Sequence, residues 1–426
     1  MSPLTLCLIV SALTIFSYIL GKFSMATTAL LSIFLFVATG CLPAATAAAN
    51  FGNANAILLV AMFVVAAGFN RTQLVNKVAG SVNKLAKGNL TRIMFGYVLV
   101  TMLLAQLIRS SMVAYSIVIP MIIATCNERD MHPSKMAYPL GFIAICTAGT
   151  LPIGGAAGQY AELQGYIDSV GYVGYTVGFF DVAKARIPTL IILCLYAIFI
   201  APRFAPDQPV VAVGEVKGGK AAKEPLPPFQ EACGYIIMIL VILGLCFQPF
   251  GLATWTIALL GAVLMVATGV LKPKEALDSI PWWIFFVYVG ALTMGNALAA
   301  TGAGTVVGDA LANFVLKLGN KYLIGFVIFF IPFAMTQVMM NNAVITIFVP
   351  IAALTAQALG VNPIGLVILA QAGSLSAIMS PMATPTVPMS MALGGYDLKS
   401  VLKQSVIPAV LCTVVSVGWI MTVFPF

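Results

Sequence analysis

Two long apolar stretches of this chain are interrupted by polar or helix-breaking residues, and this feature most constrains the fold. The first stretch covers 136–163, with Gly154 and Gly155 at its interruption, and the second covers 362–394, with Thr384 and Pro385. Of all residues, 61% are hydrophobic and only 8% are charged, which is more apolar surface than a soluble core absorbs. We therefore predict an all-α polytopic membrane protein. Inside a bilayer, interrupted backbone survives only where it faces protein or a water-filled cavity.

Several other classes of protein are excluded by composition. The single histidine, His132, and eight cysteines without a CxxC pair favour neither a metal centre nor a disulfide framework. The formal charge of +8 comes from basic residues between apolar segments, not from a basic and aromatic face, so no nucleic-acid partner is expected. We expect membrane lipid and a small anion as partners, and no cofactor beyond a possible coupling Na⁺.

The interruptions belong to a longer pattern that occurs twice. Each interrupted stretch follows two apolar arms joined by a polar tip, at 90–126 and at 321–357. Pro120 and Pro350, near the middle of the second arms, are 350 − 120 = 230 residues apart, and Gly154 and Thr384 are also 230 apart. Interrupted segments at corresponding places of two halves indicate a transporter site near the bilayer midplane.

The polar tips are the candidate substrate ligands. Their residues are Arg109, Ser110 and Ser111 in the first half, and Asn341 and Asn342 in the second. A helix that ends at midplane presents free N–H groups, which favour a carboxylate or another oxyanion. Hydroxyl, amide and unwound carbonyl oxygens nearby suit Na⁺.

Topology follows from the charges between segments. We predict ten crossings, with the arms at 90–126 and 321–357 forming re-entrant hairpins; separate crossings for each arm remain the alternative. With both termini outside, sixteen basic residues face the cytoplasm and four face outward, as the positive-inside rule requires for a cell inner (plasma) membrane. The four are Lys184, Arg186, Lys317 and Lys321. Five crossings and one hairpin in each half predict an inverted repeat.

Three segments lie outside this scheme of crossings. The stretches 71–88 and 299–319 are amphipathic and precede the hairpins, so they are expected to form helices along the membrane surface, with ordinary polar loops as the alternative. The stretch 203–229 is rich in Pro, Gly and Lys and is predicted to be a cytoplasmic linker between the halves.

The interruptions also resemble a known family. The segments GTLPIGGAAG (149–158) and MSPMATPTVP (379–388) are similar to the broken-helix motifs of the divalent anion:sodium symporters, the dicarboxylate transporters of the ion transporter superfamily. The tips resemble that family's paired Ser-Asn-Thr motifs, and the likeness covers nearly the whole chain. This chain differs in three places: Ser110-Ser111-Met112 and Met340-Asn341-Asn342 at the tips, and Gly154-Gly155 in place of Thr-Pro.

The resemblance implies ligands and a mechanism. It implies one Na⁺ site at Gln106, Ser110, Ser111 and Gly154, a site that lacks the family's asparagine, and a second site at Thr336, Asn341 and Ala383. It also implies a homodimeric elevator that carries di- or tricarboxylates by Na⁺ symport or anion exchange. Its scaffold would be 1–70 and 230–297, its arm helices 71–88 and 298–319, its moving domain 89–202 and 320–426, and its linker 203–229.

Two questions of function stay open from the sequence. Arg109 would lie deep in the membrane, paired with the substrate or with Glu162, unless it extends to the cytoplasmic surface. A cation/proton antiporter of the same superfamily is the alternative function, with Glu162 as its one candidate carboxylate. An intramembrane enzyme is a remote alternative, because the chain offers no nucleophile, base or metal cluster there.

Overall fold

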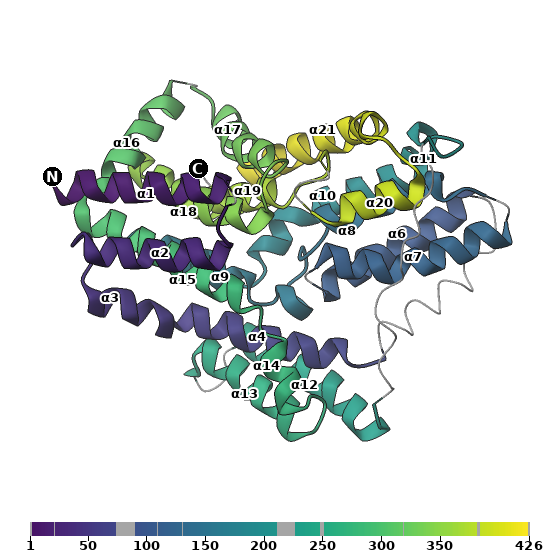
Figure 1. Ribbon diagram of the computed structural model, residues 1–426, viewed down its shortest axis with the longest axis horizontal. Helices are drawn as coiled ribbons and strands as arrows, with labels where there is room; N and C mark the ends of the chain where they lie inside the picture. Colours follow the sequence, from purple (N-terminus) through teal and green to yellow (C-terminus); the bar gives the residue numbers. More distant parts are fainter. Residues whose placement is uncertain are drawn as a thin grey trace.

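The computed structural model describes every residue except 1, 21, 74–89, 109, 130, 211–225, 248–250, 318, 381–383 and 425–426. The described residues form helices and connecting turns and contain no strand, which confirms the all-α prediction. Figure 1 shows the longest helices running along one common direction, as expected of helices that cross a bilayer.

The described part of the first half contains eight longer helices and several short ones. They are α1 (Pro3–Leu20), α2 (Met25–Ala38), α3 (Ala44–Ala49), α4 (Ala54–Asn70), α6 (Leu90–Leu107), α7 (Ser111–Glu128), α8 (Ala137–Cys146), α9 (Gln159–Ser169), α10 (Asp181–Phe199) and α11 (Ala201–Phe204), with 3-10 turns η1 (Asn50–Gly52), η2 (Pro133–Lys135) and η3 (Gly154–Ala156).

The second half repeats this order. Its helices are α12 (Pro228–Phe247), α13 (Thr254–Ala267), α14 (Pro273–Asp278), α15 (Trp282–Thr301), α16 (Ala303–Leu316), α17 (Lys321–Met335), α18 (Asn341–Leu359), α19 (Pro363–Ser374), α20 (Thr386–Gly394) and α21 (Leu398–Val423).

Corresponding helices occupy corresponding places in both halves. The short helices α3 and α14 begin 273 − 44 = 229 residues apart, and α7 and α18 begin 341 − 111 = 230 residues apart. Contacts between the halves are reciprocal: α2 packs on α15, and their equivalents α13 and α4 pack on one another. Such an exchange is what a two-fold relation between the halves produces. The opposite orientation of the two halves remains a prediction.

Both broken helices occur where the sequence places them. In the first half α8 ends at Cys146 and α9 begins at Gln159, and in the second α19 ends at Ser374 and α20 begins at Thr386. Every residue of α8 and of α19 is buried, which explains why these segments show no polar face. Each is packed by both arms of its own hairpin, α8 by α6 and α7, and α19 by α17 and α18.

The hairpin arms are longer than expected in three cases out of four. The sequence predicts about 15–17 residues per arm, whereas α6 and α7 have 18 each, α17 has 15 and α18 has 19. An 18-residue helix is about 27 Å long, close to the thickness of the hydrocarbon core. By length and hydropathy together, α6 and α18 could therefore cross, and the re-entrant arrangement remains a prediction.

Seven helices of the described ranges are long and apolar enough to span a membrane. They are Ala44–Phe69, Leu90–Leu107, Asp181–Phe199, Pro228–Leu245, Trp282–Thr301, Asn341–Leu359 and Leu398–Val423. Five of these match predicted crossings, and the other two are the hairpin arms α6 and α18. In the predicted crossings 26–49 and 253–270, α2 and α13 are apolar helices of 14 residues each.

The connecting segments are described in part. Of the predicted surface stretch 71–88, only 71–73 lies within the described residues, and of the linker 203–229, only 203–210 and 226–229. In the other surface stretch, Gly302 in the left-handed region (φ 73°) ends α15, and α16 follows it and packs on α18. The start of the linker is held by Lys135, which lies 2.6 Å from Asp207 and donates to the carbonyl oxygen of Pro202.

Candidate functional site

A cavity of about 470 Å³ lies where the two halves meet. Both hairpin tips, the second broken helix, the inner part of α4 and the start of α15 contribute to its wall. Its lining residues are Phe63, Ala66, Ala67, Ile108, Ser110, Ser111, Met112, Ala148, Gln159, Ser279, Pro281, Trp283, Ile284, Met340, Asn341, Asn342, Ile345, Gln371, Leu375, Thr384 and Pro385. Such a volume and a mainly apolar lining with a few convergent polar groups are typical of a small-molecule site.

The first hairpin tip places the N-terminus of α7 at the cavity. Ser110 is the N-cap of α7, in extended conformation, and its side chain accepts from the backbone N–H of Val113 at 3.4 Å. A serine here favours a helix start, because its oxygen binds an N–H group that lacks an intrahelical partner. The remaining free N–H groups of this turn carry partial positive charge toward the cavity.

The second tip is built differently, although it lies at the same place in its half. α18 begins at Asn341, and its N-cap, Met340, has no side-chain oxygen to offer. The Asn341 Oδ1 instead lies 3.0 Å from the Thr336 Oγ1, which is also 2.7 Å from the carbonyl oxygen of Ser374. Three oxygen atoms of different chemistry therefore gather between the second tip and the end of α19, a donor set of the kind that Na⁺ prefers.

A chain of hydroxyls joins the second broken helix to the first tip. Thr384 Oγ1 donates to Thr386 Oγ1 at 3.4 Å, and Thr386 Oγ1 donates to Ser111 Oγ at 3.1 Å. The two partners of the last bond are 275 residues apart in sequence. These contacts hold the second broken helix beside the first tip at the cavity wall.

Two glutamines attach each hairpin to the broken helix of its own half in the same manner. Gln106 Nε2 donates to the carbonyl oxygens of Met102 (3.2 Å) and Thr147 (2.7 Å), and Gln106 Oε1 accepts from Leu151 N (2.9 Å). We call this bridge, and its equivalent in the second half, a glutamine stitch.

The second stitch is made by Gln337. Its Nε2 donates to the carbonyl oxygens of Phe333 (2.8 Å) and Ser376 (3.1 Å), and its Oε1 accepts from Met379 N (2.9 Å). Because each amide supplies a donor and an acceptor, it satisfies one C=O and one N–H group that unwinding of the broken helix leaves without helical partners.

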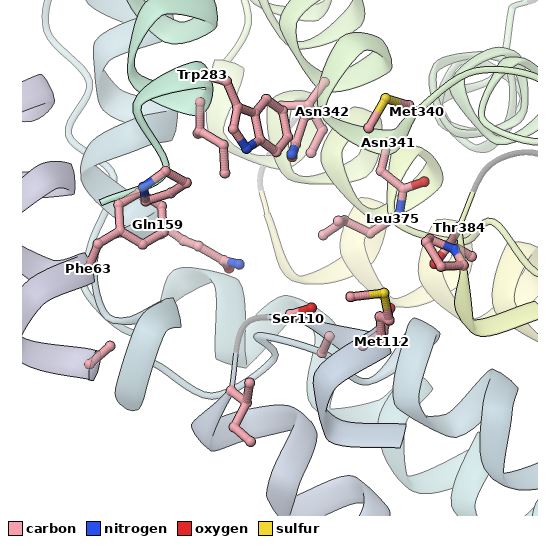
Figure 2. A pocket seen from close by; sticks show the side chains of 18 of the residues that line it. Phe63, Ser110, Met112, Gln159, Trp283, Met340, Asn341, Asn342, Leu375 and Thr384 are labelled. Carbon is pink, nitrogen blue, oxygen red and sulfur yellow. The ribbon is translucent and has the colours of Figure 1, made fainter. Parts of the chain in front are cut away.

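The structure brings together six of the nine predicted substrate residues. Ser110, Ser111, Asn341, Asn342, Thr384 and Pro385 all line the cavity. Figure 2 shows Ser110 and Met112 on one side of it, with Asn341 and Thr384 close to one another on another side. Arg109, and Ala383 of the predicted second Na⁺ site, lie outside the described residues.

Gly154, a predicted substrate residue, is not among the described lining residues. Gly154 has φ +56°, and a Cβ atom there would lie 2.2 Å from the carbonyl oxygen of Leu107. Its place is therefore at the contact between the first broken helix and the end of α6, where only a residue without a side chain fits. Gln106 and Thr336, predicted Na⁺ ligands, lie behind the wall, hydrogen-bonded to the main chain as described above.

Several lining residues were not predicted from the sequence. Gln159 and Gln371 are polar residues within or at the start of buried helices, and in a membrane segment that alone indicates function. Trp283 falls near a predicted segment end and reads as an interface anchor, but it lines the cavity, and Figure 2 shows its indole over the space between Gln159 and Asn342. Helix rotation, which sequence does not fix, decides which side chains reach the cavity.

Arg186 is a further unexpected residue. The charge count above places it in an outer loop, yet it lies within α10 with only 4% of its surface exposed. Its guanidinium donates to the carbonyl oxygens of Cys146 (2.9 Å) and Ala148 (3.1 Å) at the end of α8. A positive charge is thereby fixed at the negative end of that helix, next to cavity-lining Ala148.

The electrostatic character of the cavity suits an anion. Among its described lining residues none is acidic, while helix N-termini and amide groups face it and Arg186 lies behind it. Across the described ranges, no three His, Cys, Asp or Glu side chains gather as a metal site would require. The groups near Asn341 are hydroxyl, amide and carbonyl oxygens, which suit a hard cation such as Na⁺.

Comparison with known proteins places this geometry in context. The sequence profile described as "Citrate transporter" matches residues 15–373. An uncharacterized transporter of Haemophilus influenzae is 24% identical over 415 residues, which cover 91% of this chain and 85% of that protein. The sodium-dependent dicarboxylate transporter SdcS of Staphylococcus saprophyticus is 25% identical over 410 residues, 88% of this chain and 77% of that protein.

A solved structure shares the fold at low identity. The YdaH transporter of Alcanivorax borkumensis superposes with a TM-score of 0.61 at 14% identity, over 88% of this chain and 86% of that one. The sequence relatives confirm the expected resemblance to transporters of divalent anions. Since the family profile covers most of the chain, the chain belongs to the citrate transporter family.

Proposed function

We propose that this secondary transporter carries small di- or tricarboxylates, bound in the cavity between the hairpin tips. The observation that carries the proposal is the convergence of Ser110, Ser111, Asn341 and Thr384 on one cavity with no acidic lining residue among those described. Free N–H groups at the starts of α7 and α18 would bind the carboxylate oxygens. The name of the staphylococcal relative supports the same class of substrate.

Sodium coupling is proposed for the second half. There the Thr336 hydroxyl oxygen lies 3.0 Å from the Asn341 amide oxygen and 2.7 Å from the Ser374 carbonyl oxygen. In the first half the corresponding tip, Ser110-Ser111-Met112, has no amide side chain to supply an equivalent oxygen. We therefore expect one coupled Na⁺ at the second tip and none at the first.

The transport movement is proposed to be an elevator in a homodimer. The cavity wall from α4 and α15 belongs to the proposed scaffold, and the wall from the tips and broken helices belongs to the proposed moving domain. When the moving domain slides past the scaffold, a substrate held at their boundary becomes accessible from the other side of the membrane. The antiporter alternative has less support, because Glu162, although buried, is not among the lining residues.

The test is uptake by purified protein in liposomes. Labelled di- and tricarboxylates would be offered with and without an inward Na⁺ gradient, and Na⁺-driven accumulation of at least one is expected. Asn341→Ala removes an oxygen proposed to bind both Na⁺ and substrate, so it should abolish uptake while the purified variant keeps a folded, monodisperse profile. Uptake by Asn341→Ala at the parent's rate would place the site elsewhere.

A further inference from the structure

One residue of the cavity wall, Gln371, has no role in the proposed binding of carboxylate or Na⁺. Gln371, on α19, is fully buried and lines the cavity, and neither its Nε2 nor its Oε1 meets a hydrogen-bond partner within the described part of the chain. The surrounding helix, PIGLVILAQAGS, is otherwise apolar up to its last turn. Burial of an amide without partners is unfavourable, so such a group requires an explanation.

A second amide faces the same space from the other half. Gln159 is the first residue of α9, is 3% exposed, and its Oε1 also lacks a partner among the described residues. Figure 2 shows the Gln159 side chain extending toward the middle of the cavity, on the side away from Asn341 and Thr384. Two amide oxygens from opposite halves therefore adjoin one cavity without a donor.

The chemistry of these oxygens restricts the ligand that would satisfy them. An amide oxygen is an acceptor, whereas an ionised carboxylate offers acceptors only. A plain dicarboxylate would therefore satisfy the Gln371 N–H groups and leave both amide oxygens unpaired. A hydroxyl group on the substrate both donates and accepts, so it can donate its one proton to one of these amide oxygens and accept from an amide N–H group.

Building on the proposed carboxylate transport, we infer that Gln371, together with Gln159, recognises a hydroxyl group of the substrate. The transported class is then hydroxylated di- or tricarboxylates, and the same acids without the hydroxyl are poor substrates. Sites that hydrogen-bond a substrate hydroxyl discriminate strongly, because the analogue without it leaves buried polar groups unpaired.

The experiment compares matched pairs of acids in proteoliposomes. Malate against succinate, and citrate against tricarballylate, differ by one hydroxyl in place of hydrogen. For the parent we expect kcat/KM ratios of about 10–100 in favour of the hydroxylated acid. Gln371→Met keeps the length of the side chain but removes both polar atoms, and it should bring the ratios close to one, chiefly by lowering kcat/KM for the hydroxylated acid.

A control variant and a second variant of the binding wall make the result decisive. Gln357, half-buried on α18 and absent from the cavity wall, provides the control Gln357→Met, which should keep the parent's ratios. Gln159→Met should lower the ratios in the same direction, and it serves if Gln371→Met does not accumulate.

Two outcomes overturn the inference, and they differ. Parent ratios near one, or ratios unchanged in Gln371→Met and Gln159→Met, refute hydroxyl recognition while carboxylate transport stands. Absence of transport for all four acids refutes the proposed function, and the inference with it.

Discussion

The glutamine stitches make a quantitative prediction about how each hairpin is held. Replacing Gln337 by Met keeps the size of the side chain but removes its bonds to Ser376 and Met379, at 3.1 and 2.9 Å. A net hydrogen bond contributes about 0.5–1.5 kcal/mol, and a buried group left without a partner costs about 1–3 kcal/mol. We therefore expect Gln337→Met to lower the free energy of unfolding by about 2–4 kcal/mol.

The assay uses the chain's own thiols. Of the seven described cysteines, Cys194 and Cys233 are half-buried and the other five are buried. A thiol-reactive dye reports their exposure during heating in detergent at one fixed scan rate. For a chain of this length the expected loss corresponds to about 2–5 °C in the apparent unfolding temperature.

Comparison of the halves sharpens this test. Gln106→Met should destabilise by a similar amount, because its bonds to Thr147 and Leu151 are equivalent, and the double variant should lose about the sum, since the two stitches share no partner. Gln357→Met should change the unfolding temperature by no more than the experimental error. An unfolding temperature for Gln337→Met equal to that of the parent would refute the reasoning. A loss in Gln106→Met that disappears when Na⁺ is omitted would instead support Gln106 as an ion ligand.

Three other predictions concern single positions. Gly154→Ala should abolish transport, because the added Cβ would lie 2.2 Å from the carbonyl oxygen of Leu107 at the end of α6. Gly40→Ala is the control and should retain transport, because Gly40 also has positive φ (73°) but no atom lies within 4 Å of the added Cβ. Equal transport rates in the two variants would contradict this prediction. Arg186→Met leaves two carbonyls of the first broken helix without donors and should reduce the yield of folded protein, with partial recovery in Arg186→Lys, as measured by size-exclusion chromatography. Single cysteines at Lys220 and Lys317 should react with an impermeant reagent from opposite sides of the membrane, and labelling from one side would refute the inverted repeat.

The features that the sequence predicts here are polar residues within otherwise apolar membrane segments. Ser111, Asn341 and Thr384 stand out because polar groups at membrane depth are costly. The 230-residue spacing pairs Ser111 with Asn341, and Gly154 with Thr384, without any knowledge of packing. Both broken helices and six lining residues follow from that reasoning.

The features that sequence does not predict depend on side-chain direction and on segment ends. Gln371 is a single polar residue in an apolar helix, and only the rotation of α19 about its axis brings it to the cavity wall. Arg186 is the second residue of the predicted crossing 185–202, where a charge ordinarily faces water. Its burial depends on carbonyls 38 and 40 residues earlier in the chain, which α8 exposes only by ending at Cys146.

The stitches also bear on the order in which the chain folds during synthesis. The bonds of Gln106 to the first broken helix span 41 and 45 residues, and those of Gln337 to the second span 39 and 42. Each hairpin can therefore be joined to its own broken helix soon after both have left the ribosome. The bond from Thr386 to Ser111, by contrast, spans 275 residues and must wait for the second half. Ribosome-bound chains that stop shortly after α10 should already protect the first stitch, and the cavity should form only as the last helices enter the membrane.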